Sequence, residues 1–170
     1  GQDFAQLREW SEARELDWYL LEEDWHRNVK EFVKDLLHLY RKNKALYECD
    51  DSWDGFEWID PNNRDHSLIS FKRKDKRGKE IVVVLNFTPV RREDYLIGVS
   101  DGGVYEEIFN SDDTRFGGSG VINVCELKTT GRGISSCRDS VEIRVPPLAI
   151  TVLRCKRKAP ERKTDPKRKA

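Results

Sequence analysis

The chain has 170 residues, 36% of them charged, and its 31 Lys and Arg residues balance its 31 Asp and Glu residues. This length suits one domain, or one domain with attached segments, and is sufficient to bury a core. No apolar run approaches the eighteen residues that a membrane-spanning helix needs, so we expect no membrane partner.

The first predicted elements are helical. Residues 2–14 should form a charged, irregular loop, and residues 16–21 a short helical turn. An amphipathic helix then begins near Trp25, with Asp24 as the expected N-cap and Asn43 as the expected stop. Its apolar positions follow the spacing of one buried stripe: Trp25, Val29, Phe32, Val33, Leu36, Leu37 and Tyr40. Four of these residues should pack on the sandwich that follows, or on a second copy of the chain: Phe32, Val33, Leu36 and Leu37.

Beyond residue 47 the sequence changes to short apolar runs separated by Gly, Pro, Asn and Asp, a pattern that predicts an antiparallel sheet. The expected strands are 55–59, 67–73, 80–87, 94–99, 103–111, 121–127, 140–145 and 149–155. In one of them Val141, Ile143 and Val145 alternate with charged residues, which indicates one buried face. A helix followed by seven or eight short strands predicts a mainly β fold, an antiparallel β-sandwich with a helical segment beside it.

The last fifteen residues, 156–170, are strongly basic, with eight Lys or Arg residues against two acidic ones. We expect a disordered tail here. Because no aromatic residues are interleaved with the basic ones, the tail is expected to be solvated, with no nucleic acid as partner. The chain also lacks Met, so Gly1 is not expected to be a native initiator, and the sequence is expected to be part of a longer or processed chain.

The four cysteines, Cys49, Cys125, Cys137 and Cys155, are scattered. They form no C-x-x-C motif and have no His at ligand spacing, which predicts reduced thiols of a cytoplasmic protein, no metal site and no cofactor. A disulfide between Cys125 and Cys137 is the alternative.

No pattern typical of catalysis is present. The run 117–120 lacks the Lys-Ser/Thr of a phosphate-binding loop, and no Ser or Cys lies in a nucleophile-elbow motif. The many N-terminal carboxylates are explained by ion pairs with Arg8, Arg14 and Arg27. We therefore predict no catalytic residue in this chain.

All five tryptophans fall within residues 10–58, at positions 10, 18, 25, 53 and 58. A Trp among charged residues can offer a flat apolar face to a sugar ring, and the alternative is a large core residue. Trp25 begins the apolar stripe of the helix, which favours a core position there.

A series of short motifs runs along residues 1–154: G-Q-D-F-A-Q at 1–6, E-W at 9–10, R-E-L-D-W at 14–18, H-R at 26–27, G-F-E-W-I at 55–59, N-F-T-P-V at 86–90, N-S-D at 110–112, G-G-S-G at 117–120 and P-P-L-A at 146–149. In this order they resemble the α-1,4-glucan (glycogen) branching enzymes of the α-amylase clan. The resemblance departs at Gln2 and Ala5, where many members have Gly, and segment 125–140 matches poorly.

The resemblance implies a (β/α)8 barrel followed by a C-terminal β-sandwich. Residues 1–47 would be the loop after the last barrel strand and the final barrel helix, and 48–155 the β-sandwich domain, with the tail 156–170 having no counterpart. The family cleaves an α-1,4 link in a glucan and transfers the released segment to a 6-hydroxyl, by a retaining two-carboxylate mechanism. Its catalytic carboxylates would all precede Gly1. The implied partners are therefore α-glucan and the missing catalytic barrel, and the chain alone is expected to be inactive.

Trp25 and Trp58 fall where family members hold maltooligosaccharide away from the catalytic cleft, which implies that both bind carbohydrate. Trp10 and Trp18 would lie nearer the active face and brace its loops. Two alternatives remain: a self-standing glucan-binding β-sandwich module, and the equivalent domain of a debranching or trehalose-forming relative. The second should lack the run 16–18.

Overall fold

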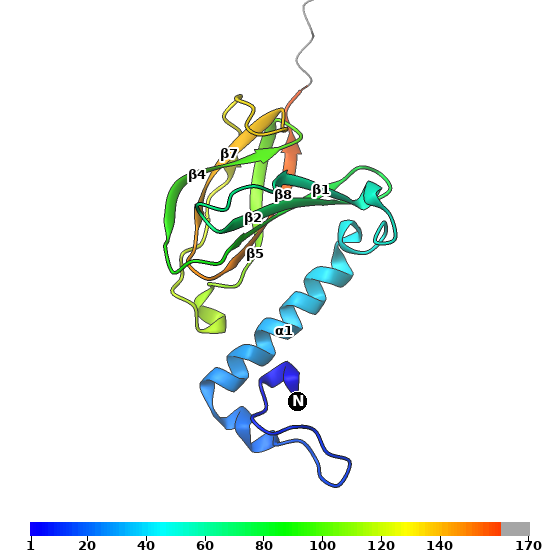
Figure 1. Ribbon diagram of the computed structural model, residues 1–170, viewed down its shortest axis with the longest axis vertical. Helices are drawn as coiled ribbons and strands as arrows, with labels where there is room; N and C mark the ends of the chain where they lie inside the picture. Colours follow the sequence, from blue (N-terminus) through cyan, green and yellow to red (C-terminus); the bar gives the residue numbers. More distant parts are fainter. Residues whose placement is uncertain (161–170) are drawn as a thin grey trace, which may run out of the picture.

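The computed structural model describes residues 1–160, in which a small N-terminal lobe, one long helix and a β-sandwich follow one another (Figure 1). The helical elements are the 3-10 turns η1 (Gln2–Phe4), η2 (Trp18–Glu22), η3 (Lys44–Leu46), η4 (Trp53–Gly55) and η5 (Thr114–Phe116), and the α-helix α1 (Asp24–Lys42). The strands are β1 (Phe56–Asp60), β2 (Leu68–Lys74), β3 (Glu80–Asn86), β4 (Arg92–Val99), β5 (Gly103–Asn110), β6 (Leu127–Lys128), β7 (Asp139–Val145) and β8 (Ile150–Lys158). Among residues 1–160, no helix combines the length and the apolar character needed to cross a bilayer.

Two antiparallel sheets form the sandwich. One has the strand order β1-β2-β3-β8-β5-β6, and the other consists of β4 and β7. The side chains between them make the main core: Ile59, Leu68, Val82, Val84, Ile97, Val99, Tyr105, Cys137, Val141, Ile143, Val145 and Leu153. The predicted mainly β, antiparallel sandwich is confirmed, and the alternating pattern of β7 points to the core as expected.

β3 is buried on both faces. Val82 and Val84 belong to the main core, whereas Ile81 and Val83 point to the opposite face of the sheet. There they meet Leu39 of α1 in a second apolar cluster. The six-stranded sheet is therefore covered by β4 and β7 on one side and by α1 with η3 on the other, which explains the continuous apolar sequence of this strand.

Of the two predicted ends of α1, the structure confirms only the C-terminal one. The predicted N-cap at Asp24 is wrong, because Glu23 is the N-cap and Asp24 is already helical, where it pairs with Arg27 one turn later. At the other end the predicted stop is confirmed. Asn43 is the C-cap, and its Nδ2 donates to the carbonyl oxygen of Leu39 at 2.7 Å, which satisfies a carbonyl left free by the end of the helix.

The apolar stripe of α1 is buried along one edge only. Phe32, and Leu39, which the predicted stripe did not include, pack on the sheet. The stripe members that remain exposed are Trp25, Leu36, Leu37 and Tyr40. Since successive helical residues are about 100° apart, Phe32 and Leu39 lie together at one side of the stripe, and the sandwich reaches only that side. The expected packing on the sandwich is therefore confirmed for Phe32 and wrong for Leu36 and Leu37, while packing on a second copy stays a prediction.

One expected strand is almost absent, because residues 121–126 are irregular and only β6 pairs with β5. The side chain of Asn123 replaces the backbone ladder. Its Oδ1 accepts from the backbone N–H of Arg144 at 2.8 Å, and its Nδ2 donates to the carbonyl oxygen of Arg144 at 3.0 Å. The segment is thus attached to β7 through one side chain.

β8 is longer than expected. Its pairing with β5 continues to Gly103 opposite Lys158, three residues past the expected limit at Cys155. The first residues of the expected basic tail therefore belong to the sheet, and residues 161–170 lie outside the described part of the chain.

Candidate functional site

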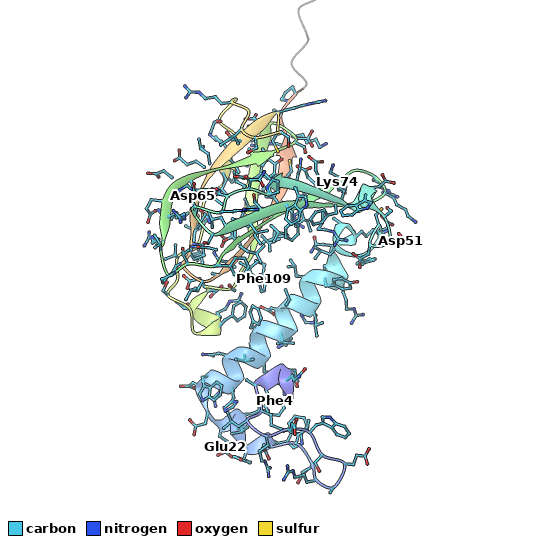
Figure 2. All side chains as sticks on the ribbon, viewed as in Figure 1. Phe4, Glu22, Asp51, Asp65, Lys74 and Phe109 are labelled. Atoms are coloured by element: carbon cyan, nitrogen blue, oxygen red, sulfur yellow. The ribbon has the colours of Figure 1, made fainter. Side chains whose placement is uncertain are left out.

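The N-terminal lobe, residues 1–22, folds back on the first turns of α1 around Phe4 (Figure 2). Phe4 is fully buried, and its carbonyl oxygen accepts from Nδ1 of the buried His26 at 2.7 Å. Asp17 is also buried, with its carboxylate held by Nε of Arg8 at 2.7 Å and its backbone N–H donating to Gln6 at 2.9 Å. These contacts fix the lobe, so the aromatic residues on it have defined positions.

Trp25 lies on the outside of this lobe with 50% of its surface exposed. Its ring centroid is 3.5 Å from that of His26, which is itself anchored to Phe4. Trp25 is therefore a supported, half-exposed apolar surface at the start of α1. Trp18 is 48% exposed and stacks on Phe4 of the lobe, with centroids 5.4 Å apart.

Trp58 lies on β1, the edge strand of the large sheet, and is 45% exposed. Its ring meets Phe56 and Phe71 edge-on, at centroid distances of 4.8 and 6.2 Å. Glu57, the residue between the two aromatics of β1, forms an ion pair with the buried Lys72 of β2. This pair attaches the edge strand to its neighbour and so holds Trp58 in place.

The electrostatics of this attachment favour the charged forms. Burial disfavours the ammonium of Lys72, but the hydrogen bond to Glu57 and the neighbouring carboxylates outweigh it, so the pKa of Lys72 is raised. Burial likewise works to raise the pKa of Glu57, yet hydrogen bonds from Lys72 and Lys74 lower it. Lys72 Nζ also donates to Ser100 Oγ at 2.9 Å, which ties the pair to the residue that follows β4.

The structure does not bring Trp25 and Trp58 together. Trp25 is the second residue of α1, whereas the turn η3, after the other end of α1, contacts β2, the neighbour of β1 (Figure 1). A helix of 19 residues is roughly 28 Å long. Any ligand contacts of the two tryptophans are therefore at separate places on the surface.

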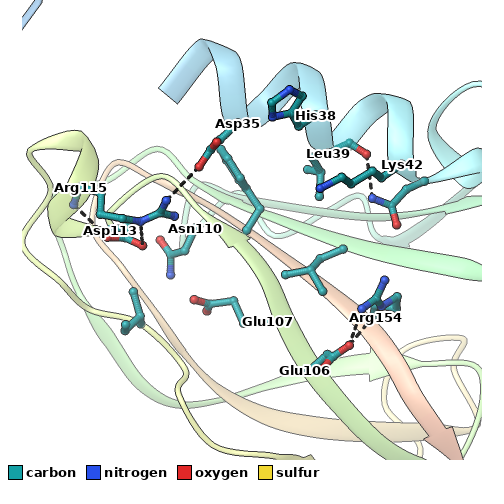
Figure 3. A pocket seen from close by; sticks show the side chains of 14 residues that line it. Asp35, His38, Leu39, Lys42, Glu106, Glu107, Asn110, Asp113, Arg115 and Arg154 are labelled. Carbon is teal, nitrogen blue, oxygen red and sulfur yellow. Dashed lines mark hydrogen bonds and ion pairs between the residues drawn. The ribbon is translucent and has the colours of Figure 1, made fainter. Parts of the chain in front are cut away.

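A cleft of about 520 Å³ between α1 and β5 was not predicted from the sequence (Figure 3). Its lining includes four carboxylates, those of Asp35, Glu106, Glu107 and Asp113. Arg115 joins Asp35 and Asp113 at 3.0 and 3.1 Å, and Arg154 pairs with Glu106 at 2.6 Å. Three of the four acids are thus engaged in ion pairs that connect the helix, the strands and the loop.

Glu107 is the exception, because no ion pair involves it among residues 1–160. Its Oε2 accepts from the backbone N–H and from Nδ2 of Asn123, at 3.2 and 2.6 Å. Burial raises the pKa of Glu107, and these hydrogen bonds only partly oppose it. The partner of Glu107 is thus the segment that ties β5 to β7, so we interpret the cleft as a structural junction. In the described residues, no group of three or more His, Cys, Asp or Glu side chains is arranged to hold a metal ion.

The Asn-Ser-Asp and Gly-Gly-Ser-Gly motifs form the loop that closes this junction. Asp112 accepts from the N–H and Oγ of Ser119, at 2.9 and 2.7 Å. A Cβ on Gly118 would lie 2.2 Å from the carbonyl oxygen of Asp112, so the loop needs glycine there. The loop thereby places Phe116 edge-on against Phe32 of α1, at 5.6 Å. These two motifs are the feature of the sequence from which the junction could have been predicted.

A family model described as "Alpha amylase, C-terminal all-beta domain" matches residues 58–156, more than half of the chain. The chain belongs to this family. The match begins within β1 and ends within β8, so this all-beta domain corresponds to the sandwich, while α1 and the N-terminal lobe lie outside it.

The similarity of this alpha amylase C-terminal domain protein to curated relatives extends beyond the residues that the family model matches. It is 46% identical over 153 residues to the 1,4-alpha-glucan branching enzyme GlgB of Oceanobacillus iheyensis, covering 89% of this chain and 24% of that protein. It is 45% identical over 153 residues to the enzyme of the same name from Nitrosomonas eutropha, covering 90% and 21%. The chain thus spans about a quarter or less of these relatives. Among solved structures, a mutant of the trehalulose synthase MUTB has a TM-score of 0.47 and 19% identity, covering 74% of this chain and 18% of that chain.

Proposed function

We propose that this chain is the C-terminal part of a 1,4-alpha-glucan branching enzyme. The observation that carries the proposal is the extent of the similarity to the branching enzymes. An alignment that covers 89% of this chain leaves out fewer residues than the N-terminal lobe and α1 contain together, so it must include part of them. The lobe and helix, residues 1–47, are then the end of the catalytic barrel, and residues 48–155 are the C-terminal sandwich.

The exposed side of α1 supports the catalytic barrel as a partner. Leu36, Leu37 and Tyr40 are neighbours on the surface of the helix, and all three are exposed. Exposed apolar side chains that form a continuous strip are typical of a surface that another part of the protein covers. The barrel would carry the carboxylates that cleave the α-1,4 link and transfer the segment to a 6-hydroxyl, in the cytoplasm.

Trp25 and Trp58 are proposed as two separate α-glucan contacts on this scaffold. Each is about half exposed and each is backed by a fixed aromatic neighbour, His26 for Trp25 and Phe56 for Trp58. A fixed indole face offers apolar contact to the C–H face of a glucose ring at little entropic cost, because the side chain is already ordered.

Affinity electrophoresis in glycogen-containing gels tests these contacts. Trp25→Ala and Trp58→Ala should each migrate faster than the native chain in glycogen and equally fast without it. Phe87→Ala, which removes another exposed aromatic residue, is the matched control and should migrate as the native chain does. Native migration of both Trp variants in glycogen would refute the proposed contacts.

The assignment of catalysis to the rest of the enzyme has its own test. The purified chain, incubated with amylose, should leave the iodine-stained spectrum unchanged, because the groups that break and form the glycosidic bond are proposed to lie in the barrel. Measurable branching by the chain alone would contradict this assignment.

A further inference from the structure

We propose that Trp53 and Trp58 form one continuous glucan-binding platform, with Phe56 between them. The inference rests on the proposed function, because it takes α-glucan as the ligand, and it adds Trp53 as a binding residue. Trp53 is 83% exposed, more than any other large apolar side chain in the described residues. A Trp that packs in a protein buries a large apolar area. At this exposure the indole of Trp53 contributes little to the packing of the chain.

Both tryptophan rings contact Phe56. Trp53 meets Phe56 edge-on at 6.2 Å, and Trp58 meets it edge-on at 4.8 Å. Phe56 in turn stacks on Phe71 of β2 at 5.2 Å, which anchors it to the sheet. Because both tryptophans contact the same ring, their centroids can be no further apart than the sum of these two distances. A short run of glucose units can therefore reach both.

The turn that carries Trp53 is fixed. Arg73 of β2 donates from Nε to the carbonyl oxygen of Gly55 at 3.1 Å and from Nη2 to Asp50 at 2.6 Å. Gly55 packs so closely that an added Cβ would lie 2.1 Å from the carbonyl oxygen of Cys49. The turn is thus held at both ends, and the exposed Trp53 ring is supported by its contact with Phe56. This is the arrangement expected of a preformed binding surface.

The polar surroundings favour a neutral polyhydroxyl ligand. Asp51 and Asp54 flank Trp53 and are exposed, and Figure 2 shows Asp51 at the outer end of this turn. Carboxylates accept hydrogen bonds from sugar hydroxyls, whereas they repel phosphate groups. Aromatic faces bordered by free carboxylates therefore suit a glucan and disfavour nucleic acid.

The test compares short and long linear α-1,4 oligosaccharides, with affinities measured by calorimetry on the purified chain. For the long maltoheptaose, Trp53→Ala and Trp58→Ala should each weaken binding about tenfold, which corresponds to about 1.4 kcal/mol. For maltose, which is too short to use both rings, Trp53→Ala should have less effect than Trp58→Ala. Trp10→Ala, which removes another strongly exposed Trp from the N-terminal lobe, is the control and should bind as the native chain does.

The outcomes separate this inference from the proposed function. Weaker binding by Trp58→Ala with native binding by Trp53→Ala overturns the shared platform and leaves the Trp58 contact standing. Native binding by both variants, and by Trp25→Ala, overturns the platform and the proposed glucan contacts together. If Trp53→Ala unfolds at a lower temperature, Trp53→Tyr decides: restored maltoheptaose affinity supports the platform, and affinity that stays low although the Tm is restored counts against it.

Discussion

The junction between α1 and the sandwich depends on three aromatic rings, and Phe32→Ala should weaken it strongly. Phe32 of the helix lies 5.7 Å from Phe109 of β5 and 5.6 Å from Phe116 of the loop, and the last two are 5.8 Å from each other. Figure 2 shows Phe109 where the helix meets the sheet. Phe32 and Leu39 are the α1 residues in the apolar cluster on this face of the sheet.

The size of the effect follows from burial. Replacing a fully buried Phe by Ala costs about 3–5 kcal/mol, and aromatic pairs contribute about 0.5–1.5 kcal/mol within that figure. Phe32 is only partly buried, so we expect the free energy of unfolding to fall by about 2–3 kcal/mol. For a chain of this length that is a Tm lower by about 5–10 °C.

Urea unfolding followed by circular dichroism measures this loss. Leu37→Ala is the matched control, because Leu37 lies on the same helix but on its exposed side, and it should cost less than about 0.5 kcal/mol. A loss below about 1 kcal/mol for Phe32→Ala, or equal losses for the two variants, would show that the aromatic contacts do not hold the helix to the sheet.

Three further predictions concern stability. Lys72→Met removes the buried member of an ion pair and should cost about 2 kcal/mol in urea unfolding, whereas Lys34→Met, at an exposed pair, should leave the Tm unchanged. The pKa of Glu107 is raised on folding, so the ionised carboxylate destabilises the folded state. The free energy of unfolding therefore falls as the pH rises through the folded-state pKa of Glu107. Glu107→Gln should therefore raise the Tm at pH 7, and the gain should vanish as the pH falls to about 4.3; a gain independent of pH would contradict this. Gly118→Ala should lower the Tm by about 5 °C because its Cβ meets a backbone carbonyl. Gly78→Asn, at an open position with φ of 72°, should not lower the Tm. Equal Tm shifts in the two variants would refute the steric argument.

Much of the sandwich could be predicted because its signals are local. The alternation in β7 and the turn residues between runs depend on neighbouring positions, and they indicated seven of the eight strands to within a few residues. The exception, residues 121–126, depends on a long-range contact. Asn123 bonds β5 and β7, and no local pattern reveals that its side chain replaces a ladder.

The surface was harder to predict than the core. A stripe of apolar residues shows that part of a helix will be covered, but not by what, so the sequence could not show that Phe32 would be covered and Leu37 exposed. The cleft depends on ion pairs between residues far apart in the chain, such as Asp35 with Arg115. The exposure of Trp58 and Trp53 was likewise a matter of which face of an edge strand, and which side of a turn, meets the rest of the protein.

The two outer strands of the large sheet have a consequence for self-association. At one edge the pairing of β1 with β2 slips between Trp58 and Asp60, and at the other β6 is only two residues long. An irregular edge and a very short edge both offer another molecule a poor template for strand pairing. The run Ile81–Leu85, of the kind that readily joins cross-β aggregates, is meanwhile kept in the middle of the sheet. Folding of the sheet therefore keeps this segment from pairing with another molecule.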